Sequence, residues 1–150
     1  MTTVPNETMI GIKAIAASEW PGDYAMQAHV VEQQSEAYLT MASYLTQLDI
    51  YNEVIANALS KAQTDWPTDF TMQVHVFEGQ MESAGAFFSY ANAAIPEHVL
   101  EAIKVNAFGE WPGDYQMMVY ALEQLHFEGM YFRHDIGYEF REENATNGKG

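Results

Sequence analysis

The chain has 150 residues, of which 48% are hydrophobic, and this is enough for one domain with a packed core. It has 21 acidic residues against 6 Lys and Arg, a formal charge of −15, which disfavours nucleic acid and anionic lipid and favours basic proteins or cations. It has no cysteine, which excludes disulfides, thiolate metal sites and cysteine nucleophiles.

A phrase of the form Trp-Pro-x-Asp-aromatic-x-Met occurs three times along the chain. It begins at Trp20, Trp66 and Trp111, so the tryptophans are 46 residues (66 − 20) and 45 residues (111 − 66) apart. A fixed period of this size is typical of a tandem array of one supersecondary unit. The predicted copies are residues 4–49, 50–94 and 95–140.

Each copy is predicted to be a helical hairpin, because its apolar residues recur at helical spacing and no segment alternates long enough for a strand. The predicted helix pairs are 5–18 with 23–45, 51–64 with 69–92, and 96–108 with 114–135. Pro5 and Pro96 suit the first position of a helix. We therefore expect an all-α domain over residues 1–140, with six helices in a pseudo-symmetric bundle or a short array, and a flexible polar tail over 141–150.

In the loop between the two helices of each copy, the Asp and the Trp of the repeated phrase can each be interpreted in two ways. Asp23, Asp69 and Asp114 are either helix N-caps or first-turn residues behind the proline, and both positions put a carboxylate at the positive end of a helix. Trp20, Trp66 and Trp111 either fill the gap between the two helices or form an aromatic clamp for a partner. Their recurrence favours the structural role.

The second helix of each copy carries a polar stripe, which we define by positions 6, 9 and 13 after the Asp, with one further histidine. The stripe residues are His29, Glu32 and Glu36 in the first copy, His75, Glu78 and Glu82 in the second, and Glu123 and His134 in the third. Positions three and four apart lie on one helix face.

Three explanations of the polar stripe remain open. The His and Glu side chains could hydrogen-bond between copies, could form a solvated face that persists from a duplication, or could bind a metal ion. In the metal hypothesis, His29, Glu32, His75 and Glu78 would ligate iron, manganese or zinc. The order His-x-x-Glu is the reverse of the usual di-metal helical motif.

No nucleophile elbow, phosphate-binding glycine loop or dinucleotide fingerprint is present, so we expect a protein that is not an enzyme and needs no cofactor. The favoured hypothesis is an acidic binding protein for a basic partner, in its sharpest form a nucleic-acid-mimicking (DNA mimic) inhibitor. A metal-binding protein, a structural or assembly protein and a homo-oligomer are the alternatives. Met1–Met9 lacks a secretory signal and no apolar run is long enough to span a bilayer, which predicts a cytoplasmic protein without membrane or direct nucleic-acid contact.

Overall fold

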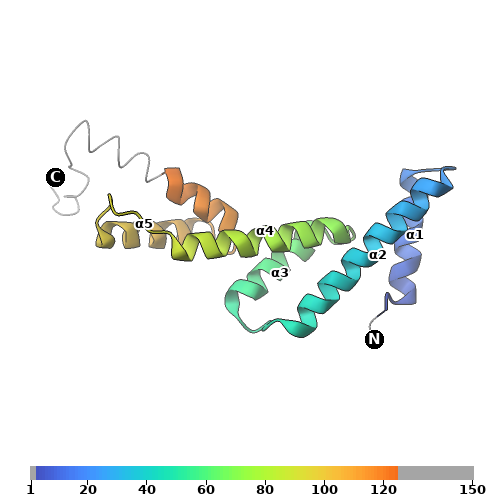
Figure 1. The fold of residues 1–150 in the computed structure, drawn as a ribbon, viewed down its shortest axis with the longest axis horizontal. Coiled ribbons are helices and arrows are strands. Elements are labelled where there is room, and N and C mark those ends of the chain that lie inside the picture. Colours follow the sequence, from blue (N-terminus) through green and yellow to red (C-terminus); the bar gives the residue numbers. More distant parts are fainter. Residues whose placement is uncertain (1–2, 125–150) are drawn as a thin grey trace. The chain divides into compact units, whose positions relative to one another are not determined.

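The structure, a computed structural model, describes residues 3–124, and Figure 1 shows their helices. The described part of the chain is all-α and contains no strand, as the sequence predicts. Its helices are α1 (Asn6–Glu19), α2 (Tyr24–Gln47), α3 (Glu53–Asp65), α4 (Phe70–Ser89) and α5 (Glu97–Glu110), followed by a sixth over residues 115–124. The predicted tail and His134 lie outside the described residues.

Helix boundaries follow from local capping. Pro5 and Pro96 are N-caps in extended conformation rather than first helical residues, so α1 and α5 each begin one residue later than predicted. Asn52 caps α3, and its side chain accepts hydrogen bonds from the backbone N–H groups of Val54 and Ile55. Each of these caps satisfies or removes donors that a helix N-terminus leaves unpaired. At its other end α4 stops at Ser89, three residues before the predicted limit.

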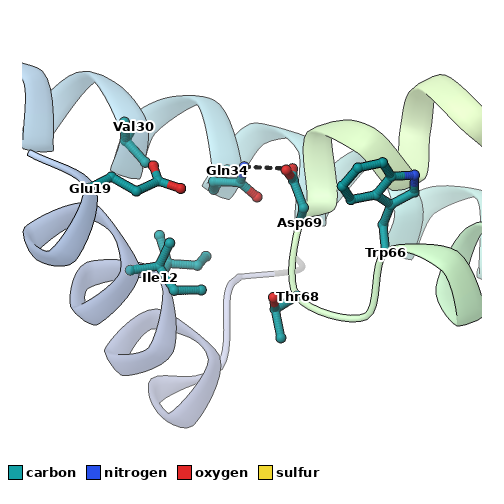
Figure 2. A pocket seen from close by; sticks show the side chains of 8 residues that line it. Ile12, Glu19, Val30, Gln34, Trp66, Thr68 and Asp69 are labelled. Atoms are coloured by element: carbon teal, nitrogen blue, oxygen red, sulfur yellow. Dashed lines mark hydrogen bonds between the residues drawn. The ribbon is translucent and has the colours of Figure 1, made fainter.

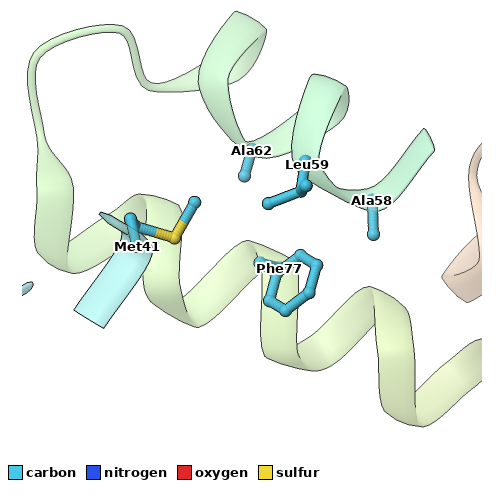
Figure 3. Close-up of a cluster of buried hydrophobic side chains, with 5 residues drawn as sticks. All are labelled: Met41, Ala58, Leu59, Ala62 and Phe77. Carbon is cyan, nitrogen blue, oxygen red and sulfur yellow. The ribbon is translucent and has the colours of Figure 1, made fainter. Parts of the chain in front are cut away.

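The chain divides into two compact units, and the boundary falls within α4, between Met81 and Glu82. In the first unit α1 packs against α2, where Ile12 and Ala16 of α1 are buried. A second cluster lies between α2, α3 and α4 (Figure 3). Its buried members are Met41, Ala58, Leu59, Ala62 and Phe77. Three of these five residues come from α3, and full burial of each large side chain contributes about 1.5–3 kcal/mol.

The second unit has an aromatic cluster of its own. The ring of Phe88 lies 6.1 Å from Tyr115 and 6.4 Å from Phe108, and Phe87 is buried beside it. The Lys104 ammonium donates to the carbonyl oxygens of Phe88 (3.3 Å) and Tyr90 (2.9 Å), around the C-terminus of α4. A cation is favoured there because the last carbonyl groups of a helix carry partial negative charge.

The first helix of each copy buries apolar residues that recur at helical spacing. These are Ile12, Ala58, Leu100 and Ile103, together with the alanines four residues before each tryptophan. Tyr24, the first residue of α2, is 77% exposed although it is aromatic.

Candidate binding surface

The described stripe residues are exposed to solvent. His29, Glu32 and Glu36 lie on α2, His75, Glu78 and Glu82 lie on α4, and Glu123 lies in the helix over 115–124. Within residues 3–124, Glu78 is the stripe residue whose side chain forms a hydrogen bond, which it accepts from the Tyr44 hydroxyl. This bond joins the first two predicted copies, so the explanation of hydrogen bonds between copies holds for Glu78, whereas the exposure of the other described stripe residues fits a solvated face.

The hydrogen bond to Glu78 changes the acidity of the Tyr44 hydroxyl. Its hydrogen bond to Glu78 is the main cause of a raised Tyr44 pKa, and burial and the negative charge of Glu78 add to it. Each of these effects disfavours the phenolate. The contact joins α2 to α4 within the first unit.

The stripe histidines and glutamates do not assemble a metal centre in the described residues. No three His, Asp or Glu side chains among residues 3–124 come together in a way that could hold an ion. The ligand set His29, Glu32, His75 and Glu78 therefore has no geometric support as one site, because a bound metal needs several ligands converging on one point.

The tryptophans of the three Trp-Pro loops share one backbone conformation. The φ and ψ angles are −129° and 65° at Trp20, −133° and 70° at Trp66, and −125° and 63° at Trp111. The backbone N–H of each tryptophan donates a hydrogen bond to the carbonyl oxygen of the buried alanine four residues earlier, at 3.0–3.1 Å. Gly22 and Gly113 have φ near +78°, which only glycine adopts without strain, whereas the second loop has Thr68 at that place.

The aspartate of each loop is an N-cap, which decides between the two positions that the sequence leaves open. The Oδ1 atoms of Asp23, Asp69 and Asp114 accept hydrogen bonds from the backbone N–H three residues later, at 3.1–3.2 Å. Such a cap typically contributes about 1 kcal/mol. The tryptophans are between the two predicted extremes, since Trp20, Trp66 and Trp111 are 40%, 39% and 37% exposed. Each tryptophan is therefore partly buried and partly accessible to solvent.

Gln34 on α2 holds the start of α4. Its Nε2 donates to Asp69 Oδ1 (2.9 Å) and to Thr71 Oγ1 (3.3 Å), and its Oε1 accepts from the backbone N–H of Phe70 (2.7 Å). One amide thus supplements the N-cap and satisfies a first-turn N–H that has no partner within its own helix. Gln34 is not among the residues predicted from the sequence, although a signal exists: the position 11 residues after Asp is Gln34 in the first copy and the buried Gln80 in the second.

The Asp69 carboxyl responds to these contacts. Burial raises its pKa and is the largest single effect, but hydrogen bonds from Gln34, Thr71 and Met72 together outweigh it and lower the pKa below the ordinary value. Hydrogen bonds to the carboxylate favour its charged form. Asp69 is therefore held as an anion at the rim of a hollow.

The hollow lies between α1, α2 and the loop that follows α3 (Figure 2), and we call it the Glu19–Asp69 hollow. Its volume is about 220 Å³, below the roughly 300–1,000 Å³ of pockets that enclose a drug-sized ligand. It is lined by Ile12, Ile15, Glu19, Val30, Gln34, Trp66, Thr68 and Asp69. The lining thus combines apolar side chains with two carboxyl groups and no basic group.

A second hollow in the same unit, of about 370 Å³, has a lining without acidic or basic side chains. It lies between α2 and the start of α4 and is lined by Tyr38, Met41, Ala42, Leu45, Gln63, Pro67, Phe70 and Gln73. Its lack of carboxylates makes it an internal comparison for the Glu19–Asp69 hollow.

Comparison with known proteins assigns no family, because no protein-family model, curated protein or solved structure matches this chain. Among residues 3–124, no helix is both long and apolar enough to cross a membrane.

Proposed function

We propose that this chain is a non-enzymatic acidic binding protein that engages a basic surface of a partner protein. The observation that carries the proposal is the exposure of the polar stripe, whose glutamates have little internal compensation. The lysines of the described residues are Lys13, Lys61 and Lys104. Lys61 pairs with Asp65 at 3.1 Å, and Lys104 is bound to carbonyl oxygens. A basic partner would supply the missing positive charge.

In the sharpest form of the proposal, the chain is an inhibitor that occupies the nucleic-acid-binding groove of its partner. Glu32 and Glu36 are four residues apart on α2, as Glu78 and Glu82 are on α4, which corresponds to a rise of about 6 Å along a helix. Helices hold the backbone positions of these residues at fixed spacing, so little backbone ordering is needed before binding. A regular row of anions on a rigid rod is a feature that nucleic acid shares.

We propose further that the surface is built from three tandem helical hairpins. The supporting observations are the recurrence of one tryptophan backbone conformation and of one aspartate cap in the three Trp-Pro loops. Copies of one unit would present similar carboxylates several times to the same partner, and several weak contacts on one chain bind more tightly than one.

The proposal is tested by capturing partners from an extract of the source cells with three forms of the protein. One is the unaltered chain, one has four stripe glutamates changed to glutamine, and one has four exposed glutamates elsewhere changed to glutamine. The stripe variant carries Glu32→Gln, Glu36→Gln, Glu78→Gln and Glu82→Gln, and the control carries Glu53→Gln, Glu97→Gln, Glu101→Gln and Glu110→Gln. Removing four charges from −15 leaves −11 in both variants, so net charge is matched.

We expect a basic protein, identified by mass spectrometry, that is retained by the unaltered chain and the control but lost from the stripe variant. Its affinity should fall steeply between about 0.05 M and about 0.3 M salt, because screening weakens contacts between exposed charges. Equal capture by all three forms, or an affinity indifferent to salt, would overturn the proposal. Displacement of nucleic acid from the captured partner distinguishes mimicry from binding elsewhere.

A further inference from the structure

The C-terminal ends of three helices carry an electrostatically unfavourable residue. Helices α1, α3 and α5 end at Glu19, Asp65 and Glu110, and none has a basic residue in its last turn. A carboxylate at this position faces the partial negative charge of the last carbonyl groups, which is unfavourable. Asp65 is compensated by Lys61, which lies four residues earlier on the same helix.

Glu19 differs from Asp65 in its surroundings, because it lines the Glu19–Asp69 hollow with a second carboxyl group across from it. Figure 2 shows Glu19 reaching from the end of α1 toward Gln34, and Asp69 on the far side. No Lys, Arg or His contributes to this lining. The positive end of α4 is already offset by Asp69, whose Oδ1 accepts from the Met72 N–H. The hollow therefore combines several negative groups that a single cation would compensate.

We propose that the Glu19–Asp69 hollow holds an arginine side chain of the basic partner. This inference rests on the proposed function, and it names the contact that the partner makes. The three methylene groups of an arginine would lie on the apolar lining formed by Ile12, Ile15 and Val30. Its guanidinium group would lie between the carboxylates of Glu19 and Asp69.

Three features favour arginine over other occupants. The volume of about 220 Å³ accommodates one long side chain and is small for a nucleotide or an aromatic cofactor. The planar guanidinium stacks on aromatic rings and binds carboxylates through several donors, whereas the lysine ammonium is a compact and strongly hydrated charge. The six-membered ring of Trp66 is on the side of the hollow in Figure 2, and its indole nitrogen is on the far side. Tryptophan is the best aromatic partner for a cation.

The test is a titration of the full chain with N-acetyl-L-arginine amide, followed by nitrogen–proton NMR at low salt. We expect saturable shifts of the Trp66 indole N–H and the Gln34 side-chain amide, with millimolar affinity. The neutral citrulline counterpart should cause no saturable shift, and the lysine counterpart should bind at least about twofold more weakly. The lining of the neutral hollow, such as Met41, should not respond.

Two pairs of variants locate the binding. Glu19→Gln should weaken arginine binding about threefold, which is typical of a partly exposed ion pair. Its control is Glu7→Gln, which removes an exposed carboxylate from the same helix outside the hollow. Trp66→Leu should weaken binding about two- to fivefold, whereas Trp20→Leu, outside the hollow, should not. Thermal melting shows whether either tryptophan variant has lost its fold, and Glu19→Gln retains the test if one has.

Equal shifts with citrulline, equal affinity for lysine, or no effect of Glu19→Gln would overturn the arginine site. The outcome is separable from that of the proposed function, because the stripe variant keeps Glu19 and Asp69. If the stripe variant and the unaltered chain capture partners equally but both bind arginine, the arginine-site proposal stands and the stripe proposal fails. If capture depends on the stripe and arginine does not bind, the stripe proposal stands and the arginine-site proposal fails.

Discussion

Replacement of Gln34 by leucine should remove the hydrogen bonds that join α2 to the start of α4, while leaving side-chain volume nearly unchanged. The change removes a donor to a charged acceptor, Asp69 (2.9 Å), and an acceptor for the Phe70 N–H (2.7 Å). A hydrogen bond to a charged group contributes about 1.5–3 kcal/mol and a neutral one about 0.5–1.5 kcal/mol. The site is half-buried, so water replaces part of both, and we take the lower end of each range, about 2 kcal/mol in all.

The assay is urea unfolding followed by circular dichroism at 222 nm. With a slope of about 2 kcal/mol per molar urea, a loss of about 2 kcal/mol lowers the midpoint by about 1 M. The matched control is Gln33→Leu, at an exposed position one residue earlier on α2, which should change stability by less than about 0.5 kcal/mol. In an Asp69→Ala background, Gln34→Leu should cost about 1.5 kcal/mol less, because the charged bond is already gone.

Equal midpoints for the Gln34 and Gln33 variants would refute the assignment of Gln34 as a stabilising contact. If Gln34→Leu lowers stability by the same amount in the Asp69→Ala background, then Asp69 is not the partner through which Gln34 stabilises the protein. A change in slope rather than midpoint would mean that unfolding no longer occurs in one step, and the comparison would then use the first transition alone.

Two further predictions concern burial and pH. Tyr115→Ala should cost about 3 kcal/mol or more in urea unfolding, and Tyr24→Ala less than about 0.5 kcal/mol, because the equivalent aromatic is 1% exposed in one case and 77% in the other; equal costs would contradict this difference. The Asp69 pKa is lowered on folding. Its carboxylate therefore stabilises the protein at pH values above 3.8, its ordinary pKa, and this stability is lost as pH falls through the folded-state pKa. The stability advantage of the unaltered chain over Asp69→Asn should therefore be constant from pH 7 to pH 5 and shrink below about pH 4. An advantage independent of pH would contradict the charge argument, and dilute samples are needed near the isoelectric point of about 4.4.

The sequence alone predicted the helical class and the order of the helices. Apolar residues at helical spacing also marked most of the buried positions on the first helix of each copy. These features depend on local patterns: Ile12 and Ala16, or Ile103 and Ala107, recur at helical spacing, and Pro and Asp mark where helices begin. The pattern also identified the loop aspartates as residues at a helix start. It could not choose between a cap and a first-turn position, because that choice depends on backbone angles within one or two residues.

Tertiary structure alone decided the environment of each polar group. The His-x-x-Glu pattern is compatible with a buried network, a metal site or a solvated face, because helical periodicity gives a side chain's direction but not what lies opposite it. The structure leaves the described stripe residues exposed and brings Gln34 to Asp69, 35 residues apart along the chain. It also brings Glu19 and Asp69 to one hollow. Contacts between distant residues depend on how helices pack, so periodicity within one helix carries no information about them.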